Sequence, residues 1–241
     1  MSPQQCSCVR LITILLAAVF VSGCASGPRY HYKLDPKYGV ADPQFRRTMS
    51  SLLGPPLVEG NTVTTLVNGA DIFPAMLKAI REARTSINFE TYVYWSGAVG
   101  ATFAEALAER ARSGVKVHVL IDAVGGNKMD PVYVETMREA GVELDLFHKL
   151  KWFDITSAQK FDHRTHRKLL IVDGKIGFTG GVGIADDWIG HADEADHFRD
   201  NHYRIEGPVV AQLQSAFLDE WMEITGGVLH DADYLDRKSV V

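Results

Sequence analysis

The chain alternates between short apolar runs and longer segments whose apolar residues recur at helical spacing. Residues 63–67, 86–94, 115–122, 142–147, 169–172, 176–179 and 202–206 have the length and composition of strands. Residues 71–84, 101–113, 131–140 and 209–225 carry apolar side chains three and four positions apart, which predicts amphipathic helices. Gly114 and Gly141 favour the ends of two of these helices. This order predicts an α/β domain with a mixed, largely parallel sheet flanked by helices.

The N-terminal segment has a different pattern and is left out of the predicted fold. Arg10 precedes an apolar run at residues 11–21, which is shorter than the ~20 residues of a membrane-spanning helix and typical of a secretory signal peptide. The run ends in the sequence VSGC at residues 21–24, which resembles a bacterial lipobox. We therefore expect a lipoprotein signal peptide at residues 1–23 and a lipid on Cys24. An ordinary signal peptide that ends at a cysteine by chance is the alternative.

The expected lipid anchor sets the predicted location. No Asp stands directly after Cys24, which by resemblance to known sorting signals favours the outer membrane. The protein is thus expected in the bacterial cell envelope, as an outer-membrane lipoprotein facing the periplasm.

Composition indicates one folded domain with appendages. The 241 residues are 46% hydrophobic and 23% charged, which is typical of a globular protein. We predict a tether rich in Pro and Gly at residues 24–60, with a short helix near 43–53, a folded domain at 61–228 and a tail at 229–241. The formal net charge of −5 argues against a general nucleic-acid binder, because such proteins usually carry an excess of basic residues.

The cysteines exclude two kinds of chemistry. Cys6 and Cys8 lie in the segment to be removed, and Cys24 would be acylated, so the mature chain has no thiolate nucleophile and no cysteine metal site. The polar run at residues 193–197 contains carboxylates and a histidine, but such runs are more often solvated than ligating. We predict no metal and no other cofactor.

The segment at residues 164–174 carries the clearest chemistry. His166 and Lys168 stand two positions apart at the entrance of an apolar strand, so their side chains share one face of it. An imidazole beside an ammonium is costly unless both meet an anion. A phosphodiester fits, because imidazole can attack phosphorus while the lysine neutralises charge on the non-bridging oxygens.

The pattern H-x-K-x4-D, followed by the glycine pair Gly180-Gly181, resembles the signature of the phospholipase D superfamily. Further blocks at residues 88–92, 114–125 and 199–208 resemble its cardiolipin synthase branch, and the resemblance covers roughly residues 60–225. Glu90 lies in the first of these blocks, where a hydrogen bond within the core explains it equally well.

The resemblance implies a role for each site residue. His166 would be the nucleophile that forms a phosphohistidine, and Lys168 would bind the phosphate oxygens. Asp200 would hold an imidazole in the right tautomer, and Asp173 joins the catalytic set, with the expected task of fixing the local turn or forming an ion pair. Backbone amides of Gly180 and Gly181 would approach the phosphate. The implied substrate is a phospholipid, with phosphatidylglycerol as first choice, and the implied reaction is phosphatidyl transfer or phosphodiester cleavage.

The resemblance also implies a second motif. Full-length members of this branch carry two motifs that build one shared site, whereas this sequence contains one. Three interpretations remain open: a homodimer, a first half that needs a second polypeptide, or an inactive, membrane-tethered binder of lipid or phosphate. The tail at 229–241 resembles a linker into a second half, which favours the second interpretation. A secreted phosphodiesterase or endonuclease is the alternative activity.

Overall fold

The computed structural model describes residues 37–148 and 164–234, which divide between residues 52 and 53 into two compact units. The described part of the first unit contains helix α2 (Pro43–Leu53), none of whose residues is buried. Asp42 begins this helix, because its carboxylate accepts a hydrogen bond of 2.7 Å from the amide of Gln44. The expected short helix is therefore confirmed. The predicted signal peptide, the lipidation site Cys24 and the first part of the tether lie outside the described residues.

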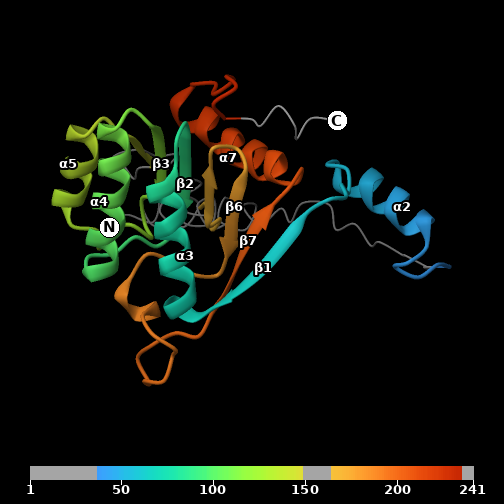
Figure 1. Cartoon of the computed structure of the whole chain (residues 1–241), viewed down its shortest axis with the longest axis horizontal. Coiled ribbons are helices and arrows are strands. Elements are labelled where there is room, and N and C mark those ends of the chain that lie inside the picture. The colour runs from blue at the N-terminus through green and yellow to red at the C-terminus, as the bar shows by residue number, and fades with distance from the viewer. Residues whose placement is uncertain (1–36, 149–163, 235–241) are drawn as a thin grey trace, which may run out of the picture. The chain divides into compact units, whose positions relative to one another are not determined.

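The second unit is built on one seven-stranded sheet with the order β1-β7-β6-β5-β2-β3-β4. Figure 1 shows helices packed against this sheet, and the α/β class with a mixed sheet is confirmed. The strands are β1 (Thr62–Val67), β2 (Ser86–Thr91), β3 (Lys116–Asp122), β4 (Glu143–Phe147), β5 (Leu169–Val172), β6 (Ile176–Gly180) and β7 (Asn201–Glu206).

The directions of the strands correct one part of the prediction. Only β2–β3 and β3–β4 are parallel among the described pairs; β1–β7, β7–β6, β6–β5 and β5–β2 are antiparallel. The sheet is therefore mixed but not largely parallel. The reason is partly local: Asp173, Gly174 and Lys175 alone connect β5 to β6, and so short a connection can only form a hairpin.

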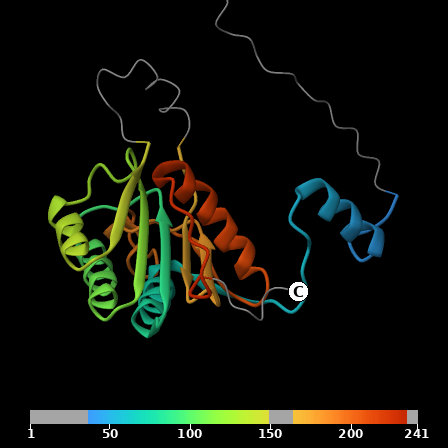
Figure 2. The same ribbon diagram turned by 90° about the horizontal axis from the view of Figure 1, so that it is seen from above.

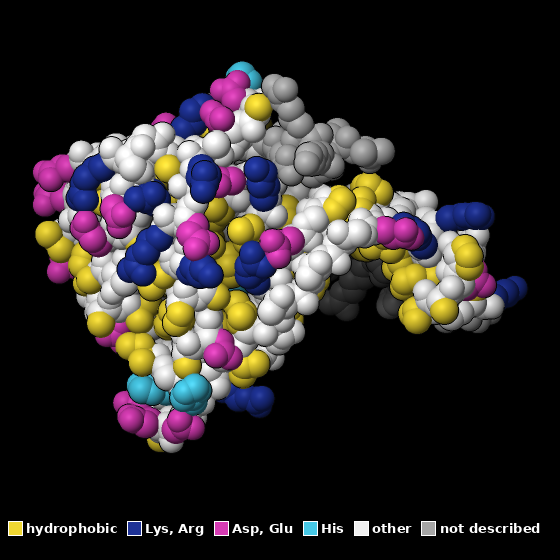
Figure 3. Space-filling model, viewed as in Figure 1, with side chains coloured by type: hydrophobic (Ala, Val, Ile, Leu, Met, Phe, Trp, Pro, Cys, Tyr) yellow, Lys and Arg dark blue, Asp and Glu magenta, His cyan; other side chains and the backbone are white. Residues whose placement is uncertain are grey.

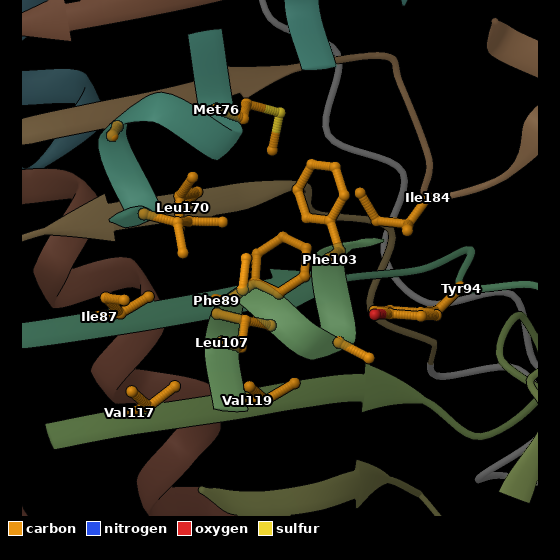
Figure 4. Packing of buried hydrophobic residues seen from close by; sticks show 14 of the residues in the cluster. Met76, Ile87, Phe89, Tyr94, Phe103, Leu107, Val117, Val119, Leu170 and Ile184 are labelled. Atoms are coloured by element: carbon orange, nitrogen blue, oxygen red, sulfur yellow. The ribbon is translucent and has the colours of Figure 1, made fainter. Parts of the chain in front are cut away.

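Helices cover both faces of the sheet (Figure 2). On one face, Phe89 of β2 and Val119 of β3 pack with Phe103, and Figure 4 shows Met76 and Leu170 turned toward the same core. On the other face, a smaller apolar cluster joins the sheet to the last helix. The helices are α3 (Asn68–Glu82), α4 (Ala98–Arg112) and α5 (Pro131–Glu139) on the first face, α7 (Val210–Thr225) on the second, and the short 3-10 helix η1 (Asp186–Trp188).

The predicted tail begins as part of the folded unit. Tyr234 is buried, and the Lys116 ammonium lies 2.9 Å from the Asp233 carboxylate. The backbone oxygen of Asp233 also accepts a hydrogen bond from the hydroxyl of Ser86 at the start of β2. Residues 229–234 therefore belong to the domain, which extends past the predicted boundary at 228. Among the described helices, none combines the length and apolar character that crossing a bilayer requires.

Candidate active site

Most of the residues singled out by the sequence, His166, Lys168, Gly180, Gly181 and Asp200, gather at one edge of the sheet. β2, β3 and β6 end at this edge, while β5 and β7 begin there, because β5 runs antiparallel to both of its neighbours and β7 runs antiparallel to β6. His166 and Lys168 directly precede β5, and Asp200 directly precedes β7. The reversal of strand direction thus brings together segments that are far apart in the sequence.

His166 and Lys168 lie in direct contact. The Lys168 ammonium donates to Nδ1 of His166 over 3.1 Å and to its backbone oxygen over 2.9 Å. The ring of Tyr92, which follows β2, lies 4.7 Å from the His166 ring between centroids, and the ammonium lies 5.5 Å from the centroid of the Tyr92 ring. The predicted shared face of residues 166 and 168 is therefore present, with the imidazole exposed and the ammonium buried beneath it.

Both side chains favour their uncharged forms more than free residues do. Burial lowers the pKa of Lys168 from its ordinary 10.5, although the Asp200 carboxylate opposes this effect. Burial and the neighbouring Lys168 charge lower the pKa of His166 from 6.5, whereas Asp122 opposes them. A neutral imidazole keeps a lone pair for attack, so this environment suits a nucleophile at neutral pH.

Asp200 lies beside the glycine pair and close to His202. Its carboxylate accepts hydrogen bonds from the indole of Trp188 (3.2 Å) and from the amide of Asn201 (2.8 Å). Burial lowers the pKa of His202 to about 4, with Asp200 opposing this shift and Lys168 adding to it. Neither ring nitrogen of His202 has a hydrogen-bond partner among the described residues. Asp200 therefore acts electrostatically on both Lys168 and His202.

The glycine pair makes room for these two side chains. A Cβ at Gly181 would lie 2.1 Å from Oδ1 of Asp200, and a Cβ at Gly180 would lie 2.7 Å from Nδ1 of His202. The amide of Gly181 donates to the backbone oxygen of Asn201 over 3.1 Å, so this amide is already engaged. The absence of a side chain at Gly181 is what the packing of Asp200 requires, and the approach of the Gly180 and Gly181 amides to a phosphate stays a prediction.

Asp173 does not join the site. It follows β5 at the end opposite His166, and its carboxylate accepts hydrogen bonds from the amides of Arg84 (3.1 Å), Thr85 (2.8 Å) and Ser86 (3.1 Å). Its own backbone is left-handed, with φ of 54°, a region that Asp adopts more readily than most residues. Placing Asp173 among the catalytic residues is therefore wrong, while the expected task of fixing a turn fits its contacts.

The sequence did not reveal how the His166 segment is anchored. Nε of Arg164 lies 3.0 Å from the buried Asp122 carboxylate at the end of β3, and Arg164 also donates to the backbone oxygen of Phe147 over 2.8 Å. The hydroxyl of Thr165 donates to the buried Glu90 carboxyl group. Asp122 lies in the family-like block at 114–125, and Glu90 lies in the one at 88–92. Membership of these blocks was the only signal in the sequence that pointed to the two residues.

The polar run at residues 193–197 forms a loose cluster. The ligand atoms of Glu194, Asp196 and His197 lie within 4.8 Å of one another, and both acidic residues are exposed. Exposed carboxylates often meet in this way without binding a cation, and nothing else in the described structure directs a ligand to this cluster. We assign it no role in the chemistry.

The arrangement at the sheet edge can bind and attack an anion. The Lys168 residue is only 8% exposed, and within the described ranges no carboxylate forms an ion pair with its ammonium. An anion that reaches the exposed imidazole would meet this ammonium directly behind it. A neutral nucleophile in contact with a cation that forms no direct ion pair is suited to a phosphorus centre, because the reaction places negative charge on the non-bridging oxygens.

A family model described as "Cardiolipin synthase, PLD-like domain" matches residues 76–221 of the chain. Among curated proteins, cardiolipin synthase 1 of Bacillus cereus is 35% identical over 175 residues, which are 73% of this chain and 34% of that protein. Cardiolipin synthase A of Pseudomonas fluorescens is 34% identical over 176 residues, again 73% of this chain and 36% of that protein. The chain thus spans about a third of the length of these relatives.

Solved structures share the fold at low sequence identity. A phospholipase D family member, Nuc of Salmonella typhimurium, aligns with a TM-score of 0.50 and 18% identity over 71% of this chain and 100% of its own. NucT of Helicobacter pylori aligns with a TM-score of 0.53 and 14% identity over 68% of this chain and 98% of its own. In both of these proteins, the part that aligns with this chain makes up the whole or nearly the whole of the protein.

Proposed function

We propose that this chain, which belongs to the cardiolipin synthase family of phospholipase D-like domains, transfers phosphatidyl groups between phospholipids. The single observation that supports this most directly is the contact of 3.1 Å between the buried Lys168 ammonium and the His166 imidazole. The preferred donor is phosphatidylglycerol, whose free glycerol hydroxyl also makes it an acceptor. Hydrolysis is the same reaction with water as the acceptor.

The first step is attack of His166 on phosphorus. In the free protein the ammonium donates to Nδ1, and the phosphodiester would draw it to the non-bridging oxygens, which leaves the imidazole free. A bond then forms between a ring nitrogen and phosphorus, and the bond from phosphorus to the leaving glycerol oxygen breaks. The product is a phosphatidyl-histidine, which the incoming hydroxyl cleaves in the second step.

The leaving alcohol needs a proton, and a second histidine is the group that would supply it. General acid catalysis contributes roughly 100- to 10,000-fold, so a site with one motif should react poorly. We propose that a second H-x-K-x4-D motif completes the site, supplied either by a second copy of the chain or by another polypeptide. In a two-fold dimer the same surface of each subunit faces the axis, which places two identical motifs together without further design.

The test is cardiolipin formation from phosphatidylglycerol vesicles by the mature chain and by His166→Ala. If a second copy of the chain supplies the second motif, we expect the wild-type protein alone to form cardiolipin and the variant to lose at least about 100-fold in rate, because both steps need the nucleophile. Thr102→Ala, at an exposed position of α4, is the matched control and should react like wild type. Unchanged turnover in His166→Ala would refute the proposed mechanism, and release of phosphatidic acid alone would identify a hydrolase.

The proposed location is the bacterial outer membrane, with the domain held on the periplasmic side by a lipid on Cys24. This proposal depends only on the sequence at residues 1–24. Cys24→Ser should move the protein from the membrane fraction to the soluble periplasmic fraction, as measured by fractionation and immunoblotting. A variant that stays in the membrane fraction would show that another feature anchors the chain.

A further inference from the structure

We call the sheet edge where His166, Lys168 and Asp200 lie the catalytic edge. The residues on either side of His166 turn away from it and contact two buried carboxyl groups. The Thr165 hydroxyl donates to Glu90 of β2, which is fully buried. The Arg167 guanidinium lies 2.8 Å from the Glu220 carboxylate of α7 and also donates to the backbone oxygen of Ala216. The segment that carries the nucleophile is therefore fixed at both neighbours, by a strand on one side and a helix on the other.

The two carboxyl groups also act on each other. Oε2 of each is buried without a hydrogen-bond partner among the described residues, and Glu220 raises the pKa of Glu90 both as a charge and as a hydrogen-bond partner. Two ionised carboxylates in contact repel, and a buried oxygen without a partner is costly. One shared proton removes both problems, because the neutral carboxyl group becomes the donor that the other lacks.

We propose that Glu90 and Glu220 share one proton and together position His166, holding Thr165 and Arg167 from beneath the catalytic edge. Glu90 is then a positioning residue, since it reaches the reacting atoms only through Thr165. This proposal deepens the proposed function and rests on it for the role of His166, whereas the shared proton stands on the burial of the two carboxyl groups and on their unpartnered oxygens.

The electrostatic surroundings agree with a neutral carboxyl group at Glu90. Burial raises the pKa of Glu90 from 4.5 to about 8, and the Glu220 charge adds to this, while Thr165 and Arg167 oppose it. The neighbouring strand positions on either side of Glu90 are the apolar residues Leu120 of β3 and Leu169 of β5. Glu220 and Arg167 are therefore the charged groups that act on it within the described structure.

The sign of the pH effect follows from this shift. The unfolded chain releases the proton at about pH 4.5 and the folded chain retains it to about pH 8, so the folded state binds more protons between these values. The stabilisation from the neutral pair is fully present below pH 4.5 and is lost as the pH rises through 8. Above pH 8 the pair carries two negative charges that repel each other. The contacts by which the pair holds Thr165 and Arg167, here called the clamp, should then weaken.

Glu90→Gln is the decisive variant. The amide keeps an oxygen that accepts from Thr165 and gains an NH2 group that can donate to Glu220, without any titration. We expect its turnover at pH 7 to stay within about threefold of wild type and to persist at pH 9, where wild-type turnover declines. Glu90→Ala, which removes both contacts, should lower kcat at least about tenfold with little change in KM, because a misplaced nucleophile slows the chemical step.

Two measurements need no substrate and so separate this proposal from the proposed function. The wild-type protein should show the infrared carbonyl band of a neutral carboxylic acid at pH 7, and this band should disappear in Glu90→Gln. The free energy of unfolding should fall between pH 5 and 8 in wild type by more than in Glu90→Gln. Glu139→Gln, which removes the same charge from an exposed position of α5, is the matched control.

The outcomes are distinct. If the band is absent in wild type, or unchanged in Glu90→Gln, the shared proton is overturned. Should Glu90→Gln retain the wild-type decline in turnover at high pH, the positioning role is overturned as well. Where Glu90→Ala fails to fold, Thr165→Val replaces it, since this near-isosteric change removes only the hydroxyl donor; full activity of Thr165→Val would refute the clamp. An inactive wild-type chain that shows the band would count against a second copy as the source of the second motif and would leave the shared proton intact.

Discussion

Lys168 holds its ammonium in an unusual environment for a lysine. The residue is only 8% exposed and lies against an imidazole and an aromatic ring. The sequence predicted the contact of His166 with Lys168, because residues two apart on an extended segment share a face. It could not predict Glu90 or Asp122 as neighbours of the same segment, because those contacts depend on the pairing of strands that are distant in the chain.

Asp173 shows how a motif position can serve the fold instead of the chemistry. Its carboxylate accepts hydrogen bonds from four donors, which are the amides of Arg84, Thr85 and Ser86 and the hydroxyl of Thr85. These bonds fix the start of β2 against the end of β5. The spacing from His166 alone could not distinguish this role from catalysis. A four-residue strand separates the two ends, and only the direction of β5 decides which end reaches the site.

We expect Asp173→Ala to destabilise the protein by about 2 kcal/mol, because several amides lose a charged acceptor and because alanine fits a left-handed backbone poorly. Urea unfolding monitored by circular dichroism measures this loss. The folded fraction should keep a wild-type kcat. A loss of kcat in fully folded Asp173→Ala would return this residue to the catalytic set.

At the scale of the elements, local sequence signals were sufficient to locate the helices and strands along the chain but not to predict the direction of each strand in the sheet. The predicted strand at 63–67 and helix at 209–225 agree closely with β1 (Thr62–Val67) and α7 (Val210–Thr225), because periodicity and helix-ending glycines are local features. Strand direction depends on where each connection leads. Four of the six strand pairs are antiparallel, and this arrangement, which the sequence did not indicate, is what assembles the catalytic edge.

The junction of β6 and β7 gives a prediction at this scale. A Cβ at Gly181 would overlap Asp200 Oδ1 at 2.1 Å, so Gly181→Ala must displace that carboxylate from Trp188 and Asn201. We expect a loss of stability of about 1–3 kcal/mol from overpacking and a clear drop in turnover, which thermal melts and the cardiolipin assay measure. Gly39→Ala is the control, because a Cβ there would meet nothing within 4 Å and because the backbone of Gly39, like that of Gly181, is not left-handed. Equal activity of the two variants would mean that the position of Asp200 does not matter.

At the scale of the whole molecule, the sequence predicted a family and a shared site, and the domain alone carries one set of catalytic side chains. On the face in Figure 3, Lys and Arg side chains are interspersed with Asp and Glu and form no continuous basic patch. The second motif that we propose would come from another chain, so a single domain cannot reveal it.

Co-expression of wild type with His166→Ala tests whether two copies share one site. If each site needs both histidines, mixed dimers are inactive, and an equal mixture should show about a quarter of wild-type turnover per total protein. Independent sites would give about half. The ratio is read from cardiolipin formation at several mixing fractions, with the composition of the mixture measured by mass spectrometry. A linear dependence on the wild-type fraction would exclude the shared site between copies.

The pairing of β1 with β7 has a consequence for how the protein is made. Thr62 lies opposite Glu206 in the sheet, so the first strand of the domain finds its partner only after nearly the whole domain has been synthesised. Pairing between such distant segments is slow, because the connecting chain loses much entropy before any contact forms. For a chain exported across the inner membrane, as we propose, late pairing of β1 with β7 would be an advantage, because a secretion channel accepts an unfolded polypeptide. The strand order that brings Asp200 to the catalytic edge would also keep the nascent chain open until it reaches the compartment where it acts.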